Sequence, residues 1–216
     1  MSEKIQQIFQ IFLFLGLKYV INFISTYMKT CSVFLFFAMF IIAGQLSNGQ
    51  SSENPVTDML LSAWSPRNFT TEPVTDQQID LIVRCGIKAP SGRNNQPWHF
   101  TVVANKDLMQ EIIPNVTEGN VLIVISGKEN DSGGTPDFDC GLATENMFIA
   151  ATSLGLGARI YGGPVAAARN NAEKLQVPAG FKPVIILRVG NIDKSPDAAS
   201  GATPRKPMEE TVNYVR

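Results

Sequence analysis

The chain has 216 residues, of which 44% are hydrophobic and 17% are charged, and its formal net charge is −1. This length predicts one domain with a short appendage, and a balanced charge without a basic stripe excludes a nucleic-acid-binding protein. The three cysteines, Cys31, Cys85 and Cys140, contain no C-x-x-C spacing, so we expect neither a disulfide framework nor a metal site.

Residues 1–49 differ in composition from the rest of the chain. Lys29 precedes an apolar run of 14 residues, Cys31–Gly44, which is followed by the small residues Ser47 and Gly49. A positive start, an apolar run of this length and small residues at its end are typical of a secretory signal peptide. We therefore predict cleavage before Gln50, with residues 50–216 as the folded domain.

A second apolar stretch, from Ile5 to Met28, leaves an alternative open. Gln10, Lys18 and Asn22 interrupt it, so its longest clean run is far shorter than the ~20 residues that span a bilayer. Either translation starts at Met28, or both stretches together anchor the protein in a membrane. We favour the first interpretation, and we expect the domain to be exported (periplasmic or extracellular) or, failing that, membrane-anchored through residues 1–49.

Beyond residue 50 the pattern alternates helices and strands. Asn54 followed by Pro55 is typical of a helix start, and Thr75 with Gln78 three residues later predicts a capping box. Buried strands are indicated by apolar, β-branched runs bounded by turn residues. We expect helices at 55–65, 76–89, 106–113, 137–154 and 165–176, and strands at 98–104, 121–126, 158–161 and 183–189. This order predicts an α+β domain, with a mixed sheet of four or five strands flanked by helices.

The most informative stretch is the loop between the second helix and the first strand, Ala89-Pro-Ser-Gly-Arg-Asn-Asn-Gln-Pro-Trp-His-Phe100. Two prolines fix the backbone at both ends, and a glycine lets the chain approach a ligand closely. The polar side chains between them are short or planar and carry both donors and acceptors. By itself this composition fits either a polar turn or a loop that holds a flat polar ligand.

The string A-P-S-G-x-N-x-Q-P-W, followed by an apolar strand, resembles the signature of the FMN-dependent nitroreductase family. The resemblance runs with gaps from Met59 to Val212. It implies a nitroreductase-like fold and a homodimer with one FMN at each interface. The implied activity is transfer of hydride from NAD(P)H through FMN to a small organic acceptor, such as a nitroaromatic or a quinone. Because the flavin carries the chemistry, we expect no catalytic side chain. We interpret the only histidine, His99, as structural, because no Ser, Cys or acidic residue nearby would orient a catalytic imidazole.

The resemblance also implies which residues bind the cofactor. Ser65 and Arg67 would contact the phosphate, although Ala63 stands where the family has a further arginine, which removes a bidentate contact. Arg205, in a P-x-R-K-P segment, would reach the same phosphate. Backbone amides around Gly162 would face the flavin ring. The full expected set is Ser65, Arg67, Pro90, Ser91, Gly92, Asn94, Gln96, Tyr161, Gly162, Gly163 and Arg205.

A second function remains open at this point. An exported domain lacks an obvious supply of NAD(P)H, and Ala63 together with a short connection after residue 113 indicates a reduced cofactor site. The alternative is therefore an exported flavin- or ligand-binding protein without general reductase activity. An absorption spectrum of the purified protein would discriminate best between flavin binding and its absence.

Overall fold

A computed structural model describes residues 54–128, 135–195 and 204–216. The chain divides into two compact units, residues 1–53 and 54–216. The predicted signal or anchor segment, residues 1–49, lies outside the described residues. In the part of the chain that is described, no helix is both long and apolar enough to cross a membrane.

The domain is built on a four-stranded sheet with the strand order β1-β2-β4-β3. The strands are β1 (Trp98–Val103), β2 (Val121–Lys128), β3 (Gly157–Tyr161) and β4 (Phe181–Gly190). All three pairings are antiparallel, whereas the sequence led us to expect a mixed sheet. The connection that leaves β1 after Val103 enters β2 at the same end of the sheet, since Val103 pairs with Leu122. These two strands therefore run in opposite directions.

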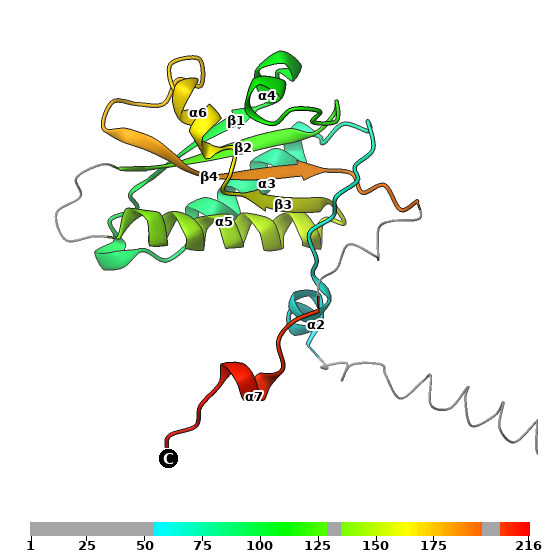
Figure 1. The fold of residues 1–216 in the computed structure, drawn as a ribbon, viewed down its shortest axis with the longest axis vertical. Coiled ribbons are helices and arrows are strands. Elements are labelled where there is room, and N and C mark those ends of the chain that lie inside the picture. Colours follow the sequence, from blue (N-terminus) through cyan, green and yellow to red (C-terminus); the bar gives the residue numbers. More distant parts are fainter. Residues whose placement is uncertain (1–53, 129–134, 196–203) are drawn as a thin grey trace, which may run out of the picture. The chain divides into compact units, whose positions relative to one another are not determined.

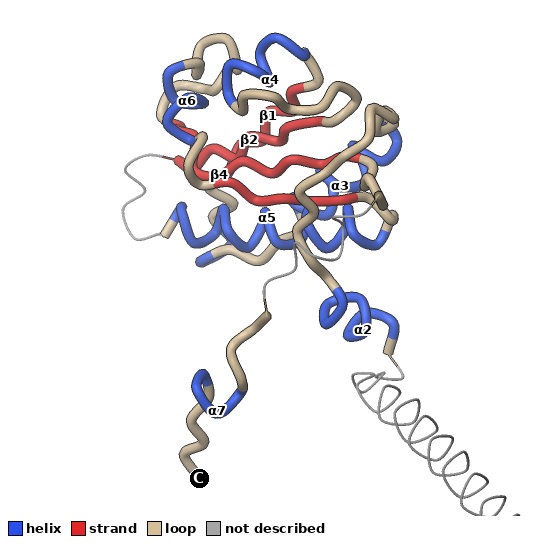
Figure 2. The backbone as a smooth tube through the Cα atoms, turned by 45° about the vertical axis from the view of Figure 1, so that its right-hand side comes forward, coloured by secondary structure: helices blue, strands red, loops and turns tan. Residues whose placement is uncertain are grey.

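Helices cover both faces of this sheet (Figure 1). One face carries α4 (Lys106–Ile112) and α6 (Val165–Asn170), and the opposite face carries α3 (Asp76–Ile87) and α5 (Pro136–Ser153). The same two layers are visible in the rotated view (Figure 2). The remaining helices are α2 (Pro55–Ser62), η1 (Gly92–Asn94) and α7 (Met208–Thr211). The predicted α+β class and the order of helices and strands from α2 to β4 are confirmed.

The predicted helix starts are present atom by atom. Asn54 Oδ1 accepts a hydrogen bond from the Val56 amide at 2.9 Å. The side chain of Thr75 and that of Gln78 each accept from the other's backbone amide, which is the expected capping box. These bonds satisfy amides that have no partner within a helix's first turn.

Two local expectations were wrong. We predicted a helix over 165–176, but α6 ends at Asn170 and turns follow. Asparagine competes with helical hydrogen bonding, and Gln176 has a left-handed φ of 53°, which no helix contains. We also expected the strand at 98–104 to be largely buried, but 41% of Val102 is exposed because β1 is an edge strand.

The sheet has apolar cores on both sides because its central strand β2 is buried along nearly its whole length. Ile123 and Ile125 pack with Met147 of α5, while Leu122 and Val124 belong to the core under α4 and α6. Alternate residues of a strand point to opposite faces, so one strand serves both cores.

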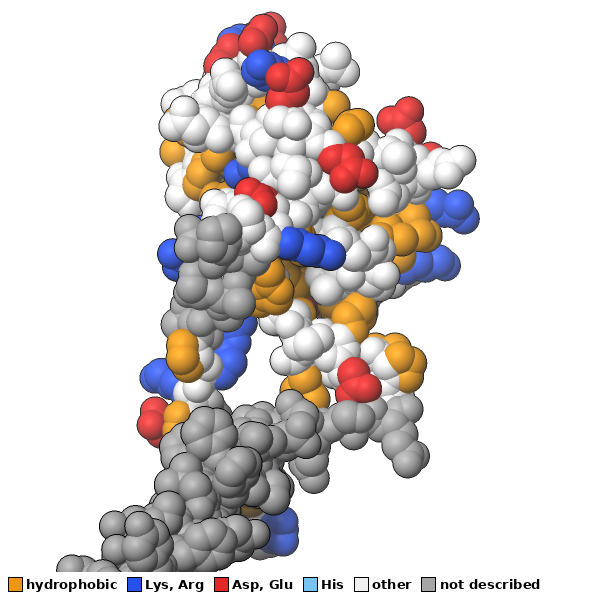
Figure 3. Space-filling model, turned by 90° about the vertical axis from the view of Figure 1, so that its right-hand side faces the viewer, with side chains coloured by type: hydrophobic (Ala, Val, Ile, Leu, Met, Phe, Trp, Pro, Cys, Tyr) orange, Lys and Arg blue, Asp and Glu red, His pale blue; other side chains and the backbone are white. Residues whose placement is uncertain are grey.

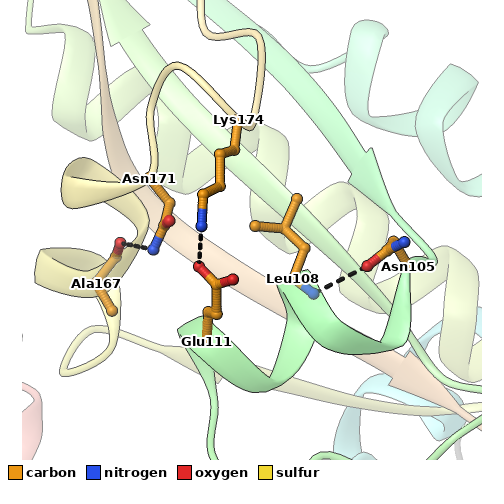
Figure 4. Close-up of polar contacts among 6 residues, drawn as sticks. All are labelled: Asn105, Leu108, Glu111, Ala167, Asn171 and Lys174. Atoms are coloured by element: carbon orange, nitrogen blue, oxygen red, sulfur yellow. Dashed lines mark hydrogen bonds and ion pairs between the residues drawn. The ribbon is translucent and has the colours of Figure 1, made fainter.

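Polar contacts also connect α4 with the turns after α6 (Figure 4). Lys174 Nζ lies 2.6 Å from Glu111 Oε2, and Asn105 Oδ1 caps α4 by accepting from the Leu108 amide at 2.9 Å. Asn171 Nδ2 donates to the Ala167 carbonyl at 3.1 Å, at the end of α6. This face of the sheet is closed by apolar packing beneath and polar contacts above.

Candidate functional site

The predicted ligand-binding loop folds as one hydrogen-bonded unit at the end of the sheet where β1 begins. The Gln96 amide donates to Ser91 Oγ at 3.0 Å, and Gln96 Nε2 donates to Asn94 Oδ1 at 3.3 Å. The Asn94 amide donates to the Ser91 carbonyl at 3.0 Å. The structure therefore brings Ser91, Asn94 and Gln96 together, and Pro90 and Gly92 lie in the same exposed or half-buried loop.

This loop holds an unusual backbone. Arg93, Asn94 and Gln96 all have positive φ, at 53°, 56° and 48°. Side-chain-bearing residues in that region cost about 1–3 kcal/mol each and persist where the surroundings over-determine them, commonly at binding sites. Pro97 is buried, and its carbonyl accepts from the Lys128 amide at 2.9 Å, which fixes the loop to β2.

The turn after β3 differs from this loop because its glycine backbone is exposed and unobstructed. Gly162 and Gly163 are exposed, and a Cβ added to either would meet nothing within 4 Å. Tyr161 is half-buried, and the Arg159 guanidinium carbon lies 5.3 Å from its ring centroid. The backbone of this turn is therefore open to a ligand.

The predicted phosphate residues Ser65 and Arg67 lie near the other end of β3. Both are exposed, and the Pro66 side chain between them lies against Gly157, whose added Cβ would be 2.6 Å from Pro66 Cγ. Five strand residues rise about 16 Å. The phosphate segment and the glycine turn therefore flank the same edge strand at that separation.

The remaining predicted residues are not brought to that edge within one chain. The Pro90–Gln96 loop precedes β1, the opposite edge strand, three strand spacings or about 14 Å from β3. Arg205 lies in the segment 204–216, in which every residue is exposed. Among the described residues, nothing links Arg205 to Ser65 or Arg67.

Sequence reasoning missed the buried Arg188 of β4. Its Nε donates to Asn120 Oδ1 at 2.7 Å, its Nη2 donates to Thr117 Oγ1 at 2.9 Å, and its guanidinium carbon lies 4.1 Å from the Phe69 ring centroid. Burial lowers the pKa of Arg188, and no carboxylate of the described residues pairs with it. The sequence feature that could have indicated this buried residue is the presence of an arginine inside the apolar run 183–189.

Asp139, in the first turn of α5, was also missed. It is 1% exposed, and its Oδ1 accepts a hydrogen bond from the Gly92 amide at 3.1 Å. An acidic residue that opens a long helix reads as a helix-capping charge in the sequence, because nothing there places it beside residue 92.

His99 shows no catalytic arrangement in the structure. Its ring lies in β1 at 6.0 Å from the ring of Phe181. Within the described ranges, no group of three or more His, Cys, Asp or Glu residues could hold a metal ion.

A groove of about 680 Å³ opens between α2, α3 and α5. Its apolar lining includes Leu81 and Ile87, which are 46% and 49% exposed, and Cys85 and Lys88 also line it. Figure 3 shows one face of the protein, on which apolar side chains reach the surface beside lysine and arginine side chains. The α3/α5 layer thus leaves large apolar side chains uncovered.

Comparison with known proteins gives a consistent result. The family model described as "Nitroreductase family" matches residues 60–123 and 114–191. An Archaeoglobus fulgidus protein with the provisional name NADH dehydrogenase/NAD(P)H nitroreductase is 32% identical over 108 residues, which cover 46% of this chain and 62% of that protein. The chain thus spans less than two thirds of that relative's length.

Two further matches cover more of the chain. The FMN reductase [NAD(P)H] of Bacillus subtilis is 27% identical over 191 residues, covering 74% of this chain and 73% of that protein. A solved structure of a provisionally identified nitroreductase from Desulfovibrio desulfuricans, in complex with FMN, is 28% identical with a TM-score of 0.64. The match covers 76% of this chain and 99% of the chain in that structure.

Proposed function

The chain belongs to the nitroreductase family, and from this premise we propose that residues 54–216 bind FMN and transfer hydride from NAD(P)H to a small organic acceptor. The observation that carries the proposal is the Ser91–Gln96 loop, whose backbone strain and internal hydrogen bonds preform a polar surface. Relatives named FMN reductase and a nitroreductase in complex with FMN support the choice of cofactor.

The residues present fit a flavin nucleotide. Ser65 and Arg67 offer a hydroxyl and a guanidinium for a phosphate, and the exposed Gly162–Gly163 backbone offers amides for a heterocycle. When bound, FMN supplies hydride transfer, which protein side chains cannot provide. The chain's own contribution is to bind, to orient and to exclude water, so a catalytic acid or base is not required.

The arrangement further supports a homodimer as the active form. A flavin lying along β3 between Arg67 and Gly162 leaves the Ser91–Gln96 loop at the far edge of the same sheet. A second copy could supply that loop across the interface. The uncovered apolar groove between α2, α3 and α5 offers the surface for such contact.

The decisive experiment is an absorption spectrum of the purified protein before and after addition of FMN. We expect flavin bands that remain with the protein after gel filtration, and bleaching of those bands by NADH or NADPH without oxygen. A protein that retains no flavin under either condition would contradict the proposal. Flavin binding without bleaching would favour the alternative of a flavin-binding protein that is not a general reductase.

The phosphate assignment has its own test. Replacing Arg67 or Arg205 by alanine removes hydrogen bonds to a charged group worth about 1.5–3 kcal/mol each, so FMN should dissociate roughly 10–100-fold more readily. Lys174→Ala, which removes one exposed positive charge beside α4, is the matched control and should leave FMN affinity unchanged. Unchanged affinity in both arginine variants would mean that the phosphate lies elsewhere.

We also propose that the domain acts outside the cytoplasm. This proposal rests only on the sequence of residues 28–50. Lys29, the 14-residue apolar run and Gly49 support signal cleavage. NAD(P)H would then reduce the purified protein, while a different electron donor would reduce the exported domain outside the cytoplasm. N-terminal sequencing of native protein tests this: a chain beginning at Gln50 supports export, and one that retains Met1 and fractionates with membranes supports an anchor.

A further inference from the structure

A single carboxylate connects the Ser91–Gln96 loop to the long helix α5. Asp139 Oδ1 accepts from the Gly92 amide at 3.1 Å, across 47 positions of sequence. Among the described residues, this is the only side-chain hydrogen bond that joins residues 90–96 to another element. The other bonds of the loop are internal, such as those of Ser91 with Gln96 and of Gln96 with Asn94.

The surroundings of Asp139 make this bond costly to keep. The residue is 1% exposed, and its second oxygen, Oδ2, is buried and has no hydrogen-bond partner among the described residues. An unsatisfied buried polar atom is rare in folded proteins and calls for an explanation beyond stability. The position in the first turn of α5 offsets part of the cost, because a helix N-terminus stabilises negative charge.

The loop itself needs an external restraint. Three of its residues with side chains are held at left-handed φ, so a free loop would relax toward other conformations. Oδ2 lies 3.8 Å from the position of a Cβ built on Gly92, so both carboxylate oxygens are close to this residue. Asp139 therefore acts on the loop at the residue where the strained segment begins.

We propose that Asp139 is a positioning residue: its carboxylate holds the Ser91–Gln96 loop in the conformation that receives the flavin. The inference rests on the proposed function for its consequence, FMN affinity, but the restraint on the loop exists without any cofactor. The two parts can therefore be measured separately.

The test compares Asp139→Ala, which removes the acceptor, with Asp139→Asn, which keeps a neutral acceptor in a side chain of the same shape. Asp137→Asn is the control, since Asp137 is exposed in the same first turn of α5 and likewise loses one negative charge there. The first readout is amide hydrogen exchange of residues 91–97 in flavin-free protein. The second is the FMN dissociation constant, measured by quenching of flavin fluorescence.

We expect Asp139→Ala to speed exchange at Gly92 and to weaken FMN binding, each by about tenfold or more, as the loss of a hydrogen bond to a charged group implies. Asp139→Asn should fall between wild type and Asp139→Ala in both readouts, and Asp137→Asn should match wild type. If Asp139→Ala does not fold, the Asn variant still decides, because any positioning role predicts faster loop exchange in it than in Asp137→Asn.

Loop exchange equal to wild type in folded Asp139 variants would overturn the inference, as would unchanged FMN affinity alongside faster exchange. A wild-type protein that binds no FMN would instead contradict the proposed function, and the exchange measurement would still judge the restraint. A general loss of helix stability would speed exchange along α5 as well as in the loop, and that pattern would also count against positioning.

Discussion

The two faces of the sheet are finished to different degrees. The α4/α6 face is closed, with a buried core under the helices and the Lys174–Glu111 contact across its surface. The α3/α5 face has an equally buried core around Met147, yet outside it α2, α3 and α5 leave a groove with Leu81 and Ile87 nearly half exposed. The difference is the one that the proposed homodimer predicts, with one face left open for a second copy and the other closed within one chain.

Breaking the open face should have the largest effect. The double variant Leu81→Glu/Ile87→Glu should raise the dissociation constant of the proposed dimer by about 100-fold or more, because each apolar side chain contributes about 1.5–3 kcal/mol when buried. Sedimentation velocity over a range of concentrations measures this. Gln110→Glu adds one negative charge at an exposed position of α4 on the closed face and should leave association unchanged. A monomeric wild type with flavin bound would contradict the proposed homodimer.

Beneath the groove, the α3/α5 core should be as sensitive as any closed core. A Cβ on Gly86 of α3 would lie 2.7 Å from Met147 Cγ of α5, so the two helices approach closely and Met147 fills the gap. Met147→Ala should lower the free energy of unfolding by about 2–5 kcal/mol, measured by urea denaturation. Met208→Ala, at a 59% exposed position, should change it by less than about 0.5 kcal/mol.

On the closed face, the hydrogen bonds of the buried Arg188 can be tested. Asn120→Ala removes the acceptor of Arg188 Nε and leaves a buried charged donor unpaired, which should cost about 1–3 kcal/mol of unfolding free energy. Asn191→Ala, whose side chain donates to the carbonyl of Glu72 in a more exposed setting, should cost less. Equal losses in both variants would mean that water replaces Asn120.

The thiol of Cys140 should make stability depend on alkaline pH. Burial raises the pKa of Cys140 from 9.0 to about 12, with smaller contributions from Asp137 and Asp139. A raised pKa in the folded state means that the unfolded thiol ionises first. Stability is therefore fully present below pH 9 and declines as the pH rises from 9 toward 12. Cys140→Ala should remove this part of the pH dependence in urea unfolding, whereas Cys85→Ala should keep it.

The smallest effect is expected at the surface of the closed face. Lys174 and Glu111 form a short contact, but 59% and 44% of their side chains are exposed. Lys174→Ala should therefore cost no more than about 1 kcal/mol, and less in high salt. A larger loss that persists in 1 M salt would show that the contact is more than a surface ion pair.

Local rules predicted much of this fold from the sequence. Asn54 and Thr75 cap helices as expected, because capping depends on a few neighbouring residues. The helix expected to reach Gln176 and the burial expected at Val102 failed, since the end of α6 and the edge position of β1 depend on tertiary packing.

The candidate site divides in the same way. The Pro90–Gln96 loop was identifiable because its residues are adjacent in sequence and its motif is long. The contact of Asp139 with Gly92 spans 47 positions, and the contact of Arg188 with Thr117 spans 71. Patterns among neighbouring residues of the sequence could not reveal contacts at such separations. Sequence also gave no indication that Arg67 and Ser91 lie at opposite edges of one sheet.

The position of β3 at the edge of the sheet bears on how the protein would behave before it binds the proposed FMN. An edge strand exposes unpaired backbone groups that can recruit strands from other chains, and short length and charge are the usual defences. β3 has five residues and carries Arg159, but Ile160 is 43% exposed on it and glycines flank its far end. Because the proposed FMN would lie along this strand between Arg67 and Gly162, we expect newly made protein to aggregate most when flavin is scarce. The supply of flavin during synthesis would then govern how much soluble protein accumulates.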